Sequence, residues 1–126
     1  MPYVNDGFGP ESKQRIVQEL VPGKQITLAH IIANPDSILY RKLGLNPDGD
    51  YRHAAIGVVT MSPAEYAIIA ADLALKASDA ELGFVDRFSG TLLITGSLSA
   101  VESSLDAVVT YARDQLGFGV CAVTKT

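Results

Sequence analysis

The sequence contains few of the residues on which redox and metal chemistry depend. It has one cysteine, two histidines and no tryptophan in 126 residues. A single cysteine excludes an internal disulfide and any metal site built from several thiolates. Cys121 lies in the apolar run 120–123, so we expect a buried strand residue, because a reactive thiol needs a basic and exposed setting. We therefore expect no metal and no cofactor.

Charge is also scarce. Asp, Glu, Lys and Arg make up 19% of the chain, whereas about 25% is usual. The net charge is −4 and the ten basic residues are scattered, which argues against a nucleic-acid partner. Since a chain of this length has much surface for its volume, some apolar surface should stay exposed, and such surface often marks an interface.

Long apolar runs are absent as well. No stretch is long enough to span a bilayer, and residues 1–7 lack the positive region and apolar stretch of a signal peptide. We therefore expect a cytoplasmic protein without a membrane partner. The length suits one domain with a real core.

The first third of the chain precedes the clearest pattern. Residues 1–14 are expected to form a flexible tail, and residues 15–24 an extended segment, with a short helix as the alternative. Residues 25–33 are typical of a strand. Either Asp36 or Ser37 can cap a short helix, and Gly44 suits the residue after its end. Residues 45–53 are expected to be an exposed loop.

Residues 55–125 then predict the order strand, helix, strand, strand, helix, strand. The expected strands are 55–61, 81–86, 91–95 and 118–124. Ser62 and Ser99 each begin a capping-box pattern, which predicts helices reaching about Ser78 and Gln115, with Gly117 at the second end. This order predicts an α+β fold with a ferredoxin-like βαββαβ core, in which two helices cover one face of a four-stranded antiparallel sheet.

A search for catalytic groups finds no coherent set. His30 lies inside an apolar strand and is expected to be a hydrogen-bonded core or interface residue, whereas His53 is expected in solvent. Asp72 and Asp86 are expected to be structural or exposed. No phosphate-binding glycine motif is present. An enzyme would need His30 or Cys121 exposed and paired with a second group, so we predict that the protein is not an enzyme.

The turn between the expected strands 81–86 and 91–95 stands out instead. It places a cation and a large apolar ring on a tight hairpin, in the order Arg87, Phe88, Ser89, Gly90. Two interpretations stay open on spacing alone. The residues form either an ordinary turn with a permissive glycine, or a loop that converges with its copies around a symmetry axis.

Several segments resemble the bacterial microcompartment (BMC) shell domain. They are residues 71–77, 81–84, 89–90 and 96–101. Two longer runs, 18–30 and 83–90, resemble the circularly permuted shell proteins of ethanolamine, propanediol and choline utilisation compartments. In that permuted form the strand and short helix that usually close the domain come first, here within residues 25–43. The resemblance covers about residues 15–126.

The resemblance implies a structural subunit of a compartment shell, forming a cyclic hexamer that tiles with its neighbours and with other shell proteins around encapsulated enzymes. The turn 87–90 would line the central axis. Lys76 would contact a neighbouring hexamer, and Asn34 would stand where unpermuted members carry an arginine-containing turn. A small β-barrel over the axis, which would gate or plug the pore, is implied for seven residues: Arg15, Ile16, Val17, Gln18, Glu19, Leu20 and Val21.

One alternative comes from another functional class. Ferredoxin-like domains also serve as small-molecule-binding regulatory modules, which would need a defined pocket with convergent polar groups. The sequence supplies no such set.

Overall fold

The computed structural model describes residues 23–45 and 54–126, which form a mixed α+β fold. Their elements, in chain order, are β1 Gln25–Ile32, α1 Ser37–Lys42, β2 Ala55–Ser62, α2 Tyr66–Ala77, β3 Glu81–Asp86, β4 Thr91–Gly96, α3 Leu98–Gln115 and β5 Thr124–Lys125. In this part of the chain no helix is both long and apolar enough to cross a membrane.

The strands form one five-stranded sheet in the order β3-β4-β2-β1-β5. The first four are antiparallel neighbours, whereas β5 runs parallel to β1. β2 lies at the centre, and its residues 55–59 are all apolar, which suits a strand that is covered on both faces.

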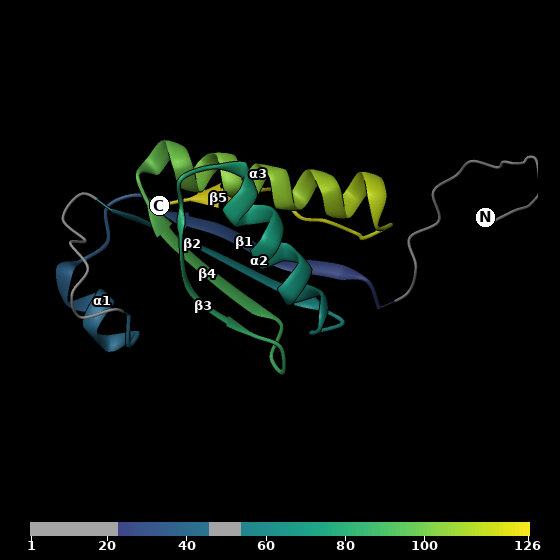
Figure 1. Cartoon of the computed structure of the whole chain (residues 1–126), viewed down its shortest axis with the longest axis horizontal. Coiled ribbons are helices and arrows are strands. Elements are labelled where there is room, and N and C mark those ends of the chain that lie inside the picture. The colour runs from purple at the N-terminus through teal and green to yellow at the C-terminus, as the bar shows by residue number, and fades with distance from the viewer. Residues whose placement is uncertain (1–22, 46–53) are drawn as a thin grey trace, which may run out of the picture.

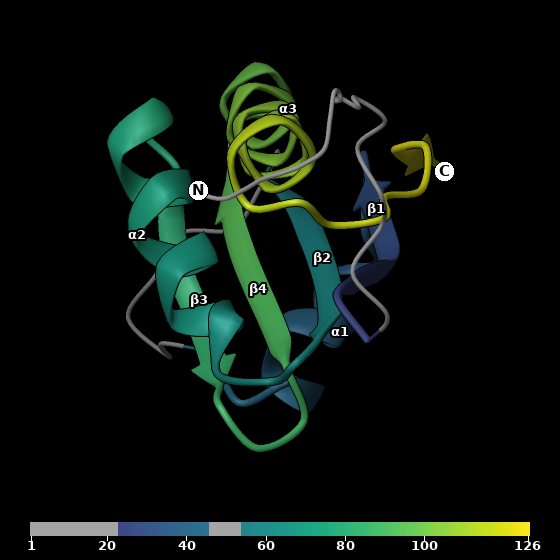
Figure 2. The ribbon, with the colours of Figure 1, turned by 90° about the vertical axis from the view of Figure 1, so that its right-hand side faces the viewer.

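The helices lie on both faces of this sheet. α2 and α3 cover one face, as Figures 1 and 2 show, while the short helix α1 packs near one end of the other. The larger core lies under α2 and α3 and includes Val59, Leu92, Leu105 and Phe118. The smaller one gathers Tyr40 and Leu45 against Ile56 and Leu93. The prediction that two helices share one face is confirmed.

The sheet order departs from a simple ferredoxin-like arrangement in one respect. β1 lies between β2 and β5, antiparallel to β2. It thereby takes the position beside the first core strand that the last strand of a βαββαβ unit would occupy. A strand that comes early in the chain therefore completes the sheet, as the permuted order implies.

The predicted last strand, residues 118–124, is consequently wrong in most of its length. Only Thr124 and Lys125 form a strand, and they pair with the outer edge of β1. Phe118 is instead buried in the main core. Cys121 is half-buried in irregular chain, which corrects its prediction as a buried strand residue.

Both predicted capping boxes are also wrong. Ser62 remains in β2, opposite Gln25, and α2 begins only at Tyr66, after Glu65, which makes no side-chain cap. In α3 the cap is Ser97, whose hydroxyl accepts a hydrogen bond from the N–H of Ala100. Ser99 lies inside the helix. In each case the strand before the helix decides where the helix begins.

The exposed-loop prediction for residues 45–53 is wrong at Leu45, which is buried in the smaller core because its side chain packs with Tyr40, Ile56 and Leu93. Three other local predictions are confirmed. Asp36 caps α1 through the N–H of Ile38, and Gly44 follows that helix with φ of 71°. Gly117 follows α3 with φ of 74°. The predicted tail 1–14 and loop residues 46–53 lie outside the described residues, as does the extended segment 15–24 up to residue 22.

Candidate functional site

The turn 87–90, which joins β3 to β4, is held by the carboxylate before it. Asp86 accepts hydrogen bonds from the N–H of Phe88 at 2.8 Å and from the hydroxyl of Ser89 at 2.9 Å. These bonds, the Phe88 N–H first, lower the pKa of Asp86 below its ordinary value of 3.8. The guanidinium carbon of Arg87 lies 5.1 Å from the centre of the Phe88 ring. Local hydrogen bonds to Asp86 and the contact of Arg87 with Phe88 therefore hold the turn in one conformation.

Gly90 fixes this turn against β2. Its φ is 77°, a region that favours glycine. Its carbonyl accepts a hydrogen bond from the N–H of Met61 at 2.9 Å. A Cβ at this position would lie 2.1 Å from the Met61 carbonyl oxygen. The predicted tight hairpin with its permissive glycine is therefore confirmed.

Phe88 at the tip of this turn is 83% exposed. So large an apolar side chain gains nothing from folding of one isolated chain, because it stays in water. Its exposure is consistent with either interpretation left open by the sequence.

The sheet register separates the predicted site residues into two groups. β1 begins opposite Ser62, and the residue before it, Met61, donates a hydrogen bond to Gly90. The start of β1 and the turn 87–90 therefore lie at one end of the sheet. In Figure 1, β1 begins at the right and the turn between β3 and β4 lies at the bottom. At the opposite end, Ile32 pairs with Ile56, and Glu81 pairs with Thr95.

Lys76 and Asn34 belong to that opposite end. Lys76 is in the last turn of α2, just before the chain enters β3. Asn34 follows the end of β1 and is exposed. The ammonium group of Lys76 lies 2.8 Å from the carboxylate of Asp72. This hydrogen bond and charge raise the pKa of Lys76, so it stays a cation over a wide pH range.

The outer face of α2 is a feature that the sequence analysis did not single out. Ile68 is 51% exposed and Leu75 is 41% exposed, and Ile69 beside them is also exposed. Only Asp72 and Lys76 are charged in this helix. A helix that is apolar nearly all round is usually buried, and this signal was available in the sequence. The expectation of exposed apolar surface is confirmed here.

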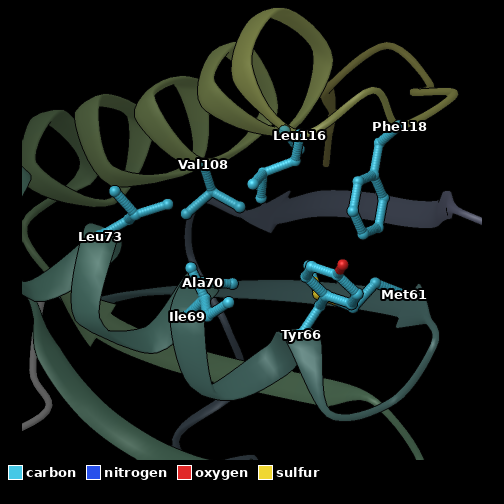
Figure 3. Close-up of a pocket in the computed structure, with 9 residues that line it drawn as sticks. Met61, Tyr66, Ile69, Ala70, Leu73, Val108, Leu116 and Phe118 are labelled. Atoms are coloured by element: carbon cyan, nitrogen blue, oxygen red, sulfur yellow. The ribbon is translucent and has the colours of Figure 1, made fainter. Parts of the chain in front are cut away.

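A shallow groove lies between α2 and α3 (Figure 3). Apart from the Tyr66 hydroxyl, the lining side chains are apolar: Met61, Tyr66, Ile69, Ala70, Leu73, Val108, Ala112, Leu116 and Phe118. The rings of Tyr66 and Phe118 meet edge to face, with centres 5.0 Å apart. A regulatory ligand would need several convergent polar groups, so this groove does not favour the regulatory alternative.

His30 is hydrogen-bonded through both ring nitrogens, as predicted, but it is half-buried in β1 and does not belong to the core. Nδ1 lies 2.5 Å from the hydroxyl oxygen of Thr124, and Nε2 lies 3.0 Å from that of Thr126. Its partners are the hydroxyls of Thr124 in β5 and of Thr126 just after it, not an acid or a thiol. Among the described residues, no three His, Cys, Asp or Glu side chains gather where they could hold a metal ion.

Comparison with known proteins defines the class. Residues 55–123 match the family model of the BMC domain. Bacterial microcompartment shell protein EutS of Escherichia coli K12 is 51% identical over 114 residues, covering 90% of this chain and 98% of that protein. PduU of Salmonella typhimurium LT2 is 46% identical over 112 residues, covering 89% of this chain and 93% of that protein. A solved CutR structure, described as a flat hexamer, is 47% identical with a TM-score of 0.75, covering 90% of this chain and all of that one.

The chain therefore belongs to the BMC-domain family of bacterial microcompartment shell proteins. Within this family it is of the circularly permuted, single-domain type similar to EutS, PduU and CutR. β1 and α1 precede the matched residues 55–123, yet β1 completes their sheet.

Proposed function

We propose that six copies of this chain form a cyclic hexamer that tiles into a microcompartment shell, and that it acts as a structural subunit and not as an enzyme. Family membership and the hexamers of CutR at 47% identity support this function. The observation that carries the arrangement is the separation of the two groups of site residues. The turn 87–90 lies at one end of the sheet, and Lys76 with Asn34 lies at the other.

The end with the turn 87–90 faces the symmetry axis in this proposal. Six copies of Phe88 and Arg87 would then surround a central opening, with each turn held in place by its own Asp86. A ring of exposed side chains on rigid turns suits a pore better than mobile loops would. The size and charge of the opening would be set by these two residues.

A barrel over this axis would be formed by residues 15–21. This proposal is supported by the start of β1, which lies at the same end of the sheet as the turn 87–90. A single extended segment leaves its backbone groups unpaired, whereas six related copies can close into a ring without free edges. Such a barrel would partly or wholly close the pore.

The opposite end meets neighbouring hexamers. Lys76 is exposed there and keeps its charge, so it can donate hydrogen bonds to carbonyl groups across an edge. Asn34 would lie near the same contact. The exposed apolar residues of α2, Ile68 and Leu75, would pack against an adjacent copy. Other shell proteins would meet the same edges, and encapsulated enzymes would lie on the inner side of the shell.

Native mass spectrometry together with size-exclusion chromatography and light scattering tests the assembly. We expect a mass of six copies of the 13.4 kDa chain. A protein that stays monomeric at high micromolar concentration would overturn the proposal. Electron microscopy of the same sample should show flat or curved sheets of hexamers at higher concentration.

A further inference from the structure

Lys24 lies just before β1 and binds the end of α3, although 92 positions in the chain separate it from its partner Leu116. Its ammonium group donates a hydrogen bond to the carbonyl of Leu116 at 3.3 Å. Leu116 is the C-cap of α3, and the last carbonyls of a helix have no partner within the helix. A lysine at this end also meets the negative pole of the helix dipole. Lys24 therefore stabilises the end of α3 in two ways.

The same ammonium group lies 5.5 Å from the centre of the Tyr66 ring. That ring is held edge to face by Phe118, which is 1% exposed (Figure 3). A lysine side chain usually extends into water, whereas Lys24 is half-buried between a ring and a helix end. The contact with the ring and the hydrogen bond together fix the direction of the side chain. We call Lys24, Tyr66 and Leu116 the Lys24 clamp.

The backbone at Lys24 is fixed as well. Its carbonyl accepts a hydrogen bond from the N–H of Gly119 at 2.9 Å, and the Gly119 carbonyl accepts one from the N–H of Ile26 at 2.8 Å. Gly23, the residue before Lys24, has φ of 89°, a region that favours glycine. Gly23 and Lys24 therefore have a defined conformation at the start of β1.

β1 does not need the Lys24 clamp for its own position. It pairs with β2 along its length and buries apolar side chains such as Ile26 and Ala29 in the main core. Its first paired residue is Gln25, so Lys24 lies outside this pairing. What the clamp adds is a fixed orientation for the chain at the point where it joins residues 15–21.

We propose that Lys24 is the positioning residue of the pore-capping segment 15–21, and that it orients this segment so that six copies meet over the axis. The inference rests on the proposed hexamer and its barrel. A barrel closes only when its strands share one tilt and stagger. A flexible connection would allow each strand many orientations, and ordering them during closure would cost conformational entropy. The clamp lowers this cost because Gly23 and Lys24 are already ordered in the subunit.

Hydrogen exchange in the hexamer of full-length chains tests this role. The backbone N–H groups of residues 15–21 should be protected in the parent hexamer, because a closed barrel pairs them. In Lys24→Ala their exchange should become about tenfold faster, as expected for the loss of a hydrogen bond from a charged group. The N–H groups of β2 should exchange at an unchanged rate, whereas a general loss of stability would accelerate them too.

Three comparisons separate positioning from packing. Lys24→Arg keeps a donor and a cation over the ring, so it should keep the parent rate. Tyr66→Phe keeps the ring and should behave like the parent, whereas Tyr66→Leu should accelerate exchange in residues 15–21. Gly23→Ala and Gly44→Ala carry similar backbone strain, at φ of 89° and 71°, and neither new Cβ has an atom within 4 Å. Only Gly23→Ala should accelerate exchange in residues 15–21.

Native mass spectrometry of the same samples distinguishes the ways in which this inference can fail. A parent chain that forms no hexamer overturns the proposed function and this inference with it. A parent hexamer without protection of residues 15–21 overturns the barrel and the role of Lys24, but not the hexamer. Protection that is equal in the parent hexamer and in Lys24→Ala overturns the positioning role alone.

Discussion

The hydroxyl of Ser104 in α3 donates a 2.6 Å hydrogen bond to the backbone carbonyl of Ala74 in α2. Ser104 is fully buried, and its oxygen also lies 2.7 Å from that of Ser78 at the end of α2. Ser78 in turn donates to the carbonyl of Ala100. Two small hydroxyls thus join the helices where alanines let them approach closely.

Replacing Ser104 should destabilise the fold. Ser104→Ala removes a buried donor between the helices, so we expect the free energy of unfolding to fall by about 1–3 kcal/mol. Ser103→Ala, one residue earlier on the exposed side of α3, should change it by no more than about 0.5 kcal/mol. Urea denaturation compares the two. Equal effects would show that the interhelical bond adds nothing to stability.

Gly90→Ala should be far more damaging than Gly44→Ala. Both glycines have positive φ, 77° and 71°, so both alanines carry the strain of about 1–2 kcal/mol of the left-handed region. At Gly44 nothing lies within 4 Å of a new Cβ, whereas at Gly90 the Met61 carbonyl oxygen lies at 2.1 Å. Chemical denaturation of both variants isolates the steric part. A loss at Gly90 no greater than at Gly44 would contradict this packing.

Replacing Phe118 should destabilise the fold strongly, whereas replacing Phe88 should hardly change its stability. Phe118 is 1% exposed, so Phe118→Ala should cost about 3–5 kcal/mol of unfolding free energy. Phe88 is 83% exposed, so Phe88→Ala should change the stability of the subunit fold by about 0.5 kcal/mol or less. Denaturation under conditions that dissociate the assembly measures both. A large loss for Phe88→Ala there would mean that its ring packs within the subunit.

The bonds at Asp86 predict a dependence of stability on pH. The folded state lowers the pKa of this carboxyl below 3.8, so the unfolded chain binds a proton more readily. The stabilisation is fully present above the unfolded pKa and is lost as the pH falls through the lower folded value. Asp86→Asn should therefore be less stable than the parent at pH 7, with the difference narrowing in acid. Carboxyl NMR should show Asp86 titrating below 3.8, and a value above it would contradict the assignment.

Lys76→Ala should separate tiling from hexamer formation. Lys76 is exposed and its partner Asp72 lies on the same helix, so the change should leave the fold and the hexamer intact. Electron microscopy should then show hexamers without extended sheets. Asp72→Ala, which frees the lysine but keeps its charge, should still form sheets. Normal sheets from Lys76→Ala would remove this residue from the edge contact.

The sequence predicted those elements whose signals are local. β2, β3 and β4 are short runs rich in apolar residues. The turn 87–90 was predicted from Gly90, because glycine tolerates the positive φ of 77° that the structure shows there. Helix starts were misplaced because a capping pattern competes with the strand before it. Ser62 keeps its pairing with Gln25 in the sheet, and Ser97, the first residue after β4, caps α3 before Ser99 can.

The last strand could not be predicted from its own residues. The run 118–124 is apolar enough for a strand, but β1 already occupies the place beside β2. That outcome depends on a segment almost a hundred residues away, which periodicity within one window does not detect. The exposed apolar face of α2 was detectable from the scarcity of charge in that helix. The roles of Lys76, Asn34 and the turn 87–90 in assembly stay predictions.

The position of β1 also determines the order in which the sheet can be completed. His30 and Thr124 are 94 residues apart in the chain, although they are neighbours in the sheet. Contacts across so long a loop form late in folding, because the chain must first lose the entropy of closing it. During synthesis β1 leaves the ribosome before β2, its first partner strand. The outer edge of β1 stays uncovered until Thr124 and Lys125 have also emerged. Nascent subunits on neighbouring ribosomes would therefore present this edge to one another before any shell exists.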